Sequence, residues 1–318
     1  MSTLLKMQKF HPLCSRCIGM YPLQNRWTVL RYLQCYENFS ECCTHLILPE
    51  TALFSPTPTF AKEPLFEEKE MLAFIEKEPQ SKLYFRKWIG SKEFINGFFR
   101  YCLWLGDCSP KELRSMPECL KRVESVKKFR LNSLSAGTRK IADKPTHFHV
   151  ENMPKSNFVL IPKVSSENRR YVPMGFLTPD ILCSDLVFII PDAELYHFGV
   201  LTSNVHMAWM RTVCGRLKSD YRYSKDIVYN NFPWCNPTPE QKAKIEKTAQ
   251  AILDARALYP DCSLADLYDE TTMPPELRKA HQANDFAVMA AYGFDRKITE
   301  SECVAELMKR YQELVEKA

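Results

Sequence analysis

The sequence predicts an α+β fold, in which a mixed α/β domain with a β-sheet core is followed by a small α-helical domain. Short apolar segments bounded by Pro, Asn, Asp and Gly lie between residues 97 and 201, and such segments are typical of strands. After residue 236 the apolar residues instead recur with helical spacing. At 318 residues, 45% hydrophobic and 25% charged, the chain is long enough for one large or two modest domains.

The first 60 residues differ from the rest of the chain in composition. They contain no aspartate, one glycine and five cysteines, and they end in a Pro-Thr stretch, Ser55 to Thr59, that is typical of a linker. We therefore leave residues 1–60 unassigned and place a domain boundary near Phe60. Their composition suggests the hypothesis that a frameshifted or mis-started reading frame encodes this segment.

The domain that follows, over residues 61–235, is predicted to contain helices and several strands. A helix over 67–78 is ended by Pro79, and a second helix, opened by Pro117, carries apolar residues near helical spacing. Strands are expected over residues 97–105, 158–164, 171–177, 186–190 and 195–201.

Capping residues mark the helices further along the chain. Ser203 caps a helix with an apolar face, and Thr238 with Gln241 forms a capping box that opens the helical domain over residues 236–318. Two more helices are expected over 275–292 and 299–316. The last one has an apolar stripe that should pack against the preceding domain or a partner. Asn284 stands where the helix before it should be apolar, which predicts weaker packing there.

Two basic segments suggest that the chain binds a polyanion. Tyrosines are interleaved with the cations of the second segment, and basic side chains can neutralise phosphates while tyrosines stack or bond to a backbone. The alternative is a solvated helix face followed by a basic loop. The first segment carries Lys111, Arg114, Lys121, Arg122, Lys127, Lys128, Arg130, Arg139 and Lys140, and the second carries Arg211, Arg216, Lys218, Arg222 and Lys225.

Metal and catalytic motifs are sparse. Cys14 and Cys17 have the spacing of half a zinc site, but no second well-spaced pair follows. His147 and His149 lack a third ligand at a suitable spacing, so no metal site is predicted. The glycine-rich phosphate loops and the serine nucleophile elbow are absent from the sequence. The segment 229–234 resembles the Asn-Pro-Pro-aromatic motif that holds a flipped base, but Phe232 replaces the first proline, and we interpret the segment as a rigid turn.

The sequence favours a cytoplasmic protein with no membrane partner. Its longest apolar runs fall far short of the roughly 18 residues that span a bilayer. No secretory signal is visible at the N-terminus, where Lys6 and Lys9 are not followed by an uninterrupted apolar stretch.

Several long stretches carry a resemblance that no short motif provides. The segments 87–97, 101–105, 162–176, 196–201, 206–211 and 215–224 resemble the target recognition domain of MmeI-like DNA methyltransferases, a family that includes fused restriction-modification enzymes. The segments 264–269 and 273–281 resemble its helical C-terminal domain. The resemblance spans about residues 61–315, and residues 1–60 do not share it.

The resemblance implies the sequence-specific DNA recognition portion of a DNA adenine-N6 methyltransferase, with double-stranded DNA as partner. In the family a preceding methyltransferase domain binds S-adenosylmethionine, and neither its cofactor motif nor its catalytic motif occurs in this sequence. No cofactor or catalytic residue is therefore expected in this chain, and a separate methyltransferase subunit is a further expected partner. The alternative is an interaction protein that docks on a methyltransferase through its helical tail without reading DNA.

Nine residues are expected to contact DNA. Four of them lie in a turn between strands and are predicted to reach a groove, where Arg is the usual bidentate reader of guanine. The other five are predicted to hold phosphates, which position the protein without specifying a sequence. A basic rim without contact is the alternative. The groove residues are Lys163, Arg169, Arg170 and Tyr171, and the phosphate residues are Arg216, Lys218, Tyr221, Arg222 and Lys225.

Overall fold

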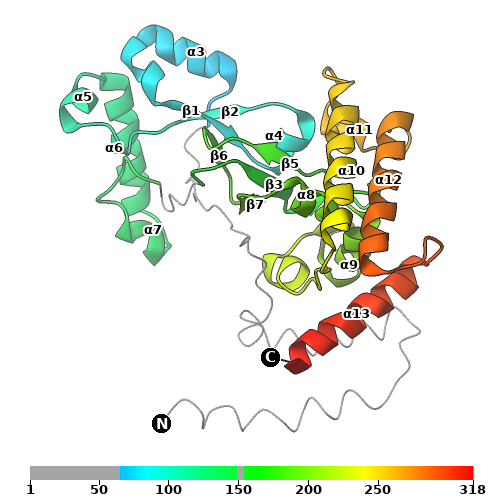
Figure 1. Ribbon diagram of the computed structural model, residues 1–318. Coiled ribbons are helices and arrows are strands. Elements are labelled where there is room, and N and C mark those ends of the chain that lie inside the picture. The colour runs from blue at the N-terminus through cyan, green and yellow to red at the C-terminus, as the bar shows by residue number, and fades with distance from the viewer. Residues whose placement is uncertain (1–64, 149–153, 318) are drawn as a thin grey trace, which may run out of the picture.

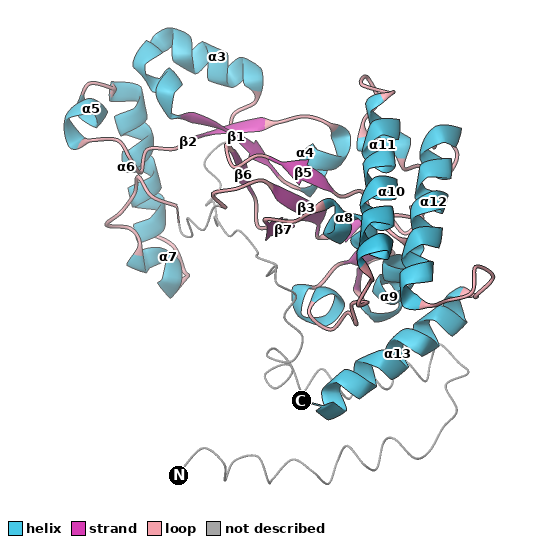
Figure 2. Cartoon of the chain, viewed as in Figure 1, coloured by secondary structure: helices cyan, strands magenta, loops and turns pink. Residues whose placement is uncertain are grey.

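The computed structural model describes residues 65–148 and 154–317. The cysteine-rich segment, the expected linker and His149 lie outside these residues. Strands occupy the middle of the molecule and helices its two ends (Figure 2), which confirms the α+β class. One end holds α3 (Glu68–Lys77), α5 (Pro110–Arg114), α6 (Pro117–Leu131) and α7 (Ala136–Lys140), and the other holds α10 (Pro239–Ala257), α11 (Leu264–Leu267), α12 (Pro275–Tyr292) and α13 (Glu300–Lys317) (Figure 1).

A buried carboxylate ties α6 to the end of α3. The helix expected over 67–78 forms as α3, and Glu78, directly after it, is buried. Its two carboxylate oxygens accept hydrogen bonds from the backbone N–H groups of Glu118 and Cys119, both at 2.9 Å. These N–H groups belong to the first turn of α6, which begins at Pro117 as expected. A carboxylate at this position satisfies free donors and interacts favourably with the helix dipole.

Three short sheets form the middle of the molecule. One has β3 (Phe158–Pro162) at its centre, paired antiparallel with β5 (Gly175–Leu177) and β7 (Val187–Pro191). The second joins β1 (Phe85–Ile89) antiparallel to β2 (Arg100–Leu103) and parallel to β6 (Ile181–Cys183). The third, which we call the small sheet, is antiparallel and has the order β4 (Val164–Ser165), β9 (Asp220–Arg222), β8 (Gly215–Leu217). The strand expected over 186–190 forms as β7, and the one expected over 158–164 forms as β3 but ends at Pro162, since Val164 belongs to the small sheet.

The other three expected strands need correction. Within 97–105 only β2 is extended, because α4 (Ser91–Asn96) ends at Gly97, whose φ of 72° is the left-handed conformation of a helix C-cap. Within 171–177 only the last three residues form β5. The strand expected over 195–201 is wrong, since these residues form α8 (Leu195–Leu201), which buries Phe198 to Leu201 consecutively. A short apolar run does not separate a buried helix from a buried strand.

The predicted caps begin the helices of the other end. Ser203 Oγ accepts from the backbone N–H of His206 at the start of α9 (Asn204–Val213). Thr238 and Gln241 form the expected capping box of α10. Thr299 and Glu302 exchange the same pair of hydrogen bonds at the start of α13. The helix expected over 275–292 forms as α12.

Asn284 strengthens the packing that it was expected to weaken. Its side chain is fully buried, and Nδ2 donates to the carbonyl of Gly199 at 2.7 Å. Its Oδ1 accepts from Thr248 Oγ1 at 3.1 Å, so that one amide joins α12 to both α8 and α10. The expectation was wrong because both polar groups of the buried Asn284 amide are hydrogen-bonded, so the side chain holds the three helices together. Gly199 permits the close approach, since a Cβ there would lie 2.7 Å from Cγ2 of Ile245.

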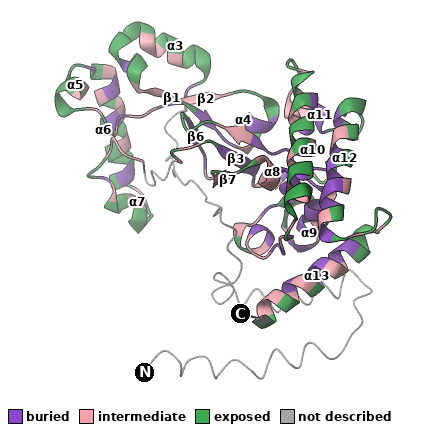
Figure 3. Cartoon of the chain, viewed as in Figure 1, coloured by how far each residue is buried: buried purple, intermediate pink, exposed green. Residues whose placement is uncertain are grey.

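The apolar stripe of α13 packs against α9 of the same chain. Val304, Leu307 and Tyr311 are buried, and the rings of Tyr311 and Trp209 lie 6.0 Å apart. Figure 3 shows buried residues along α9, α10, α12 and α13, whereas α3 and α7 are largely exposed. Among residues 65–148 and 154–317, no helix has the length and apolar character needed to cross a membrane.

Candidate nucleic-acid interface

The small sheet presents a protruding hairpin. Strands β8 and β9 are joined by a two-residue turn at Lys218 and Ser219, and residues 215 to 219 are all exposed. Lys218 has a φ of 56°, in the left-handed region that favours glycine. A non-glycine residue there costs on the order of 1 kcal/mol, and strain of this kind concentrates at functional sites. A lysine is therefore held at the tip at a cost in stability.

Arg216 on this hairpin is committed to neighbouring groups. Its guanidinium carbon lies 4.0 Å from the ring centre of Tyr221, directly across the hairpin, and its Nη1 donates to the carbonyl of Ser219 at 2.8 Å. Nη1 also lies 3.6 Å from a carboxylate oxygen of Glu167. Tyr221 itself is 8% exposed. The ring of Tyr221 thus supports the Arg216 guanidinium and is not exposed for stacking on a nucleic acid.

Arg222 at the end of the hairpin lies near two further cations, Lys163 and Lys225. Burial lowers the pKa of Lys163, and Asp185 opposes this shift. The positive charges of Arg222 and Lys225 lower the pKa further, so the three cations lie close together. The Lys163 ammonium also lies 4.5 Å from the ring centre of Phe188. The Lys225 ammonium is 3.5 Å from the exposed carboxylate of Asp226. These cations are a candidate site for an anion, with Asp185 and Asp226 as the nearby acids.

The turn that carries Arg169 and Arg170 is exposed at Arg170, half-buried at Arg169 and buried at Tyr171. Burial lowers the pKa of Arg169, and the carboxylates of Asp220 and Asp269 act in the opposite direction. Tyr171 is 3% exposed and its ring stacks on His281, with ring centres 4.2 Å apart. The side chain of Tyr171 is therefore engaged by Asp285 and His281 of α12, and its contact with a DNA groove stays a prediction.

Asp285 of α12 connects this turn to the helical domain. One carboxylate oxygen accepts from the hydroxyl of Tyr171 at 2.7 Å, and the other accepts from the first N–H group of α9, at Asn204, also at 2.7 Å. Burial raises the pKa of Asp285 to about 6, while these two donors and the nearby Arg170 lower it. One buried carboxylate thus fixes the turn and α9 together.

Arg211 of α9 forms a second connection. Its Nε and Nη2 donate to the two carboxylate oxygens of Glu300 on α13, each at 2.9 Å. Its Nη1 donates to the backbone carbonyl of Arg170 at 3.0 Å. This bidentate arrangement has directional donors, so Glu300 holds Arg211 in the orientation that anchors the turn.

A groove of about 550 Å³ lies between the turn, α9 and α13. Arg169, Arg170 and Arg211 supply the cations of its lining. Carboxylates of Glu167, Glu270 and Glu300 are part of the same lining, so the cations here are balanced by acids. The groove is therefore a less favourable place for a phosphate than the hairpin and the cations beside it.

The nine predicted residues thus fall into separate groups. Lys163, Arg222 and Lys225 are brought together, Lys218 stands at the hairpin tip, and Arg216 stacks on Tyr221. Arg169, Arg170 and Tyr171 line the groove instead. Sequence reasoning missed Asp285 and Glu300, whose partners lie 81 to 114 residues away along the chain, so no local spacing could have revealed them.

The described residues include no candidate metal centre. Within residues 65–148 and 154–317, no group of three or more His, Cys, Asp and Glu side chains is placed to hold a metal ion. His206 is fully buried, its Nε2 lies 2.9 Å from Tyr223 Oη, and burial lowers its pKa to about 3. The turn at 229–234 is packed as interpreted, since Phe232 is buried and the carbonyl of Pro233 accepts from Tyr292 Oη at 3.0 Å.

A β-sheet domain with an exposed basic hairpin, fixed to a helical domain through buried polar bonds, defines a polyanion-binding module. Comparison with known proteins identifies its family. The MmeI target recognition domain matches residues 51–236, and the MmeI C-terminal domain matches residues 237–318. The chain therefore belongs to the MmeI family and comprises these two domains.

Two relatives are considerably longer than this chain. DNA methyltransferase A of Bacillus subtilis (strain 168) is 41% identical over 253 residues, which are 80% of this chain and 29% of the relative. The solved structure of the type IIL restriction-modification enzyme MmeI in complex with DNA matches with a TM-score of 0.82 at 44% identity, covering 85% of this chain and 36% of that chain. The chain thus spans about a third of the length of these relatives.

Proposed function

We propose that this chain is the sequence-specific DNA recognition portion of a DNA adenine-N6 methyltransferase of the restriction-modification type. The observation that carries the proposal is the exposed basic hairpin of a target recognition domain whose relative was solved in complex with DNA. A two-stranded β-ribbon fits the major groove of B-DNA, where each base pair presents a distinct pattern of donors and acceptors. Such a ribbon can therefore read sequence directly.

Lys218 and Arg222 are proposed to reach the base edges. Both are exposed on the hairpin, and neither forms an ion pair with a carboxylate within the described residues. Arg169 and Arg170, which the sequence favoured as readers, lie beside carboxylates in the groove and are proposed to shape it. Lys163 and Lys225 are proposed to hold phosphates at the hairpin's side, where contacts position the protein.

The methyl transfer itself is proposed to occur outside residues 65–317. S-adenosylmethionine would bind a methyltransferase domain that lies in the same polypeptide or in a separate subunit. The recognition portion would then orient the duplex so that the target adenine can be flipped into that domain. This chain contributes binding energy and sequence selection, and none of its described residues is assigned to chemistry.

The proposal is tested by binding the purified chain to a randomised duplex-DNA library at low and moderate salt, with sequencing of the retained fraction. We expect an enriched motif and a steep loss of affinity with salt. Lys218→Gly and Arg222→Gln should change the preference at single positions by about 1–3 kcal/mol, whereas Lys225→Gln should weaken all sequences alike. Retention without enrichment, or three variants that behave alike, would contradict this assignment.

The alternative function, docking on a methyltransferase through the helical tail, is less favoured by the structure. The apolar stripe of α13, which a partner methyltransferase would have covered, is buried against α9 of the same chain. Failure of the chain to bind duplex DNA at either salt concentration would reopen this alternative.

A further inference from the structure

The segment 105–148, which we call the arm, carries the positive charge of this protein. It contains ten lysines and arginines against five acidic residues, a net charge of +5 that equals the formal charge of the whole chain. The remainder of the chain is therefore neutral overall. From Lys127 onward the imbalance is larger, because six cations face Asp143 alone.

The far end of the arm carries four exposed lysines. Lys127, Lys128, Lys140 and Lys144 are exposed, and within the described residues none of them forms an ion pair. Elsewhere on the arm, Lys121 pairs with Glu118 at 2.7 Å. At the hairpin, a carboxylate oxygen of Glu167 lies 3.6 Å from Arg216. The distal lysines share the lack of an ion pair within the described residues with Lys218 and Arg222 of the hairpin, and they lie in a segment where six cations face one acidic residue.

The distal end is also a fixed structure. Arg130 is buried, and its guanidinium donates to the carbonyls of Ile141, Lys144 and His147 at 3.1, 2.8 and 2.7 Å. One arginine therefore ties the end of α6 to α7 and to the turn that follows. The exposed lysines lie on the elements that Arg130 joins, so little conformational entropy of the backbone would be lost when they bind an anion.

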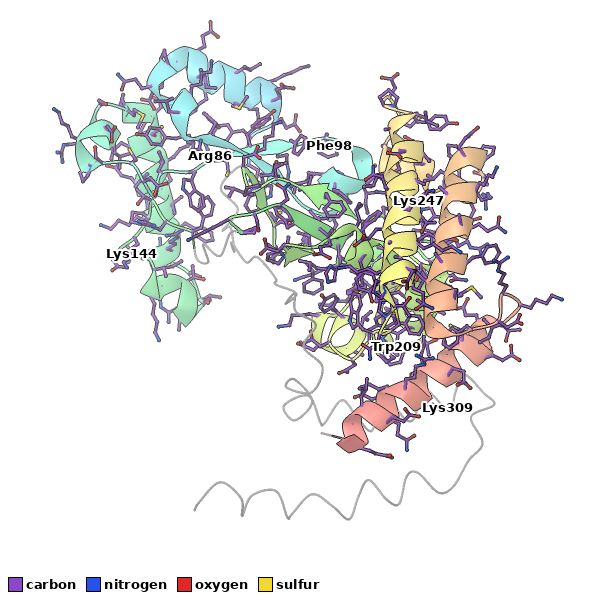
Figure 4. All side chains as sticks on the ribbon, viewed as in Figure 1. Arg86, Phe98, Lys144, Trp209, Lys247 and Lys309 are labelled. Carbon is purple, nitrogen blue, oxygen red and sulfur yellow. The ribbon has the colours of Figure 1, made fainter. Side chains whose placement is uncertain are left out.

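The arm lies at the opposite end of the molecule from the helical domain (Figure 1). Figure 4 labels Lys144 on the arm and Lys247 on α10, and the strands lie between these positions. A duplex read by the hairpin extends in both directions beyond the bases that are contacted. A fixed basic projection outside the reading site is suited to the backbone of that flanking duplex.

We propose that the distal arm binds the phosphates of duplex DNA outside the sequence that the hairpin reads. The proposal rests on the proposed function and extends it to a second contact surface. Lysine is a compact point charge without the fork geometry of arginine, so lysines spread over α6, α7 and a turn neutralise phosphates without selecting bases. The arm would therefore add affinity and leave sequence preference unchanged.

The test compares two variants of the full chain that lose the same number of charges. The arm variant is K127Q/K128Q/K140Q/K144Q, and the control is K244Q/K247Q/K279Q/K297Q, whose four lysines are exposed on the helical domain. Binding to a randomised duplex library and to a single duplex of about 40 base pairs, longer than a typical site, is measured between about 0.05 and 0.2 M salt, where phosphate contacts make affinity strongly salt-dependent.

The arm variant should reduce the slope of log affinity against log salt by about 2 to 4, since each lost phosphate contact removes about 0.9. Its enriched motif should match that of the unmodified chain, and the control should keep the original slope. Equal slopes for the arm variant and the unmodified chain would overturn the arm surface while leaving the proposed function intact. An altered motif would overturn its sequence independence, and an unmodified chain that does not bind would overturn both proposals.

Discussion

The helical end and the arm use their polar residues in different ways. At the helical end Asp285 and Asn284 are buried, and each is hydrogen-bonded to groups from other elements. On the arm the distal lysines are exposed and have no carboxylate partner among the described residues. Buried polar groups must be bonded because leaving one unsatisfied costs about 1–3 kcal/mol, whereas exposed charges remain available to a ligand.

This difference separates positioning from binding. The buried groups of α12 and α13 hold the turn at Arg170 and the start of α9, so their loss should affect stability and the geometry of the reading domain. The exposed lysines of the arm should affect DNA affinity and its salt dependence, with little effect on folding. This separation can be tested with single substitutions, and the largest expected change in the free energy of unfolding is at Asn284.

Replacing Asn284 by Ala should destabilise the protein most, by about 3–5 kcal/mol. The change leaves the carbonyl of Gly199 and the hydroxyl of Thr248 without their buried partner and opens a cavity between three helices. Urea denaturation measures the effect. Gln282→Ala, an exposed position on the same helix, serves as the control and should change stability by less than about 0.5 kcal/mol. Similar stabilities for the two variants would show that the Asn284 hydrogen bonds do not stabilise the packing of α12 on α8 and α10.

Asp285 should make stability fall as pH rises from about 4 to 7. Its pKa is raised to about 6 in the folded protein from an ordinary value of 3.8, so the folded state binds the proton more tightly than the unfolded state. This group's contribution is fully present below about pH 4 and is lost as the pH rises through about 6, with a total on the order of 3 kcal/mol at most.

The measurement is the difference in free energy of unfolding between the unmodified chain and Asp285→Asn across this pH range. The variant cannot ionise at this position, so the difference should vary with pH as described. Asp254→Asn, an exposed position on α10, is the matched control and should give a flat difference. A flat difference for Asp285→Asn as well would show that its carboxyl does not titrate in this range.

Glu300→Gln should cost less than about 1 kcal/mol of stability because half of the Glu300 side chain is exposed, and ion pairs of this kind are weak. It should nevertheless lower the ratio of specific to non-specific DNA affinity about three- to tenfold, since Arg211 would lose the partner that orients it toward the carbonyl of Arg170. Competition binding measures the ratio. Glu306→Gln on the same helix removes the same charge and should leave the ratio unchanged.

Leu134→Ser should have the smallest effect, within about 0.5 kcal/mol, because the Leu134 side chain is fully exposed at the turn between α6 and α7. Leu105→Ser, a buried position at the base of the arm, should cost about 2–4 kcal/mol by comparison. Thermal unfolding of the two variants gives the contrast. A large loss for Leu134→Ser would mean that the arm's tip is packed against something within the folded protein.

Local signals in the sequence were sufficient for most helices. Pro117, the Thr238 capping box and the Thr299 cap correctly marked where α6, α10 and α13 begin, because the first turn of a helix needs particular acceptors or a proline. The same reasoning failed over 195–201, where α8 is packed against α10 and α12 and shows no exposed face to reveal its period. Burial on all sides removes the pattern on which such predictions depend.

The candidate site shows the same division. Composition and resemblance alone indicated a basic DNA-recognition portion, since the charges and the long similar segments are written in the chain itself. Only the tertiary structure decided that Tyr171 faces Asp285, that Arg211 is held by Glu300, and that the distal lysines of the arm have no carboxylate partner among the described residues. The reason is physical: whether a cation is compensated depends on carboxylates that approach it from distant parts of the chain, and no local spacing encodes that approach.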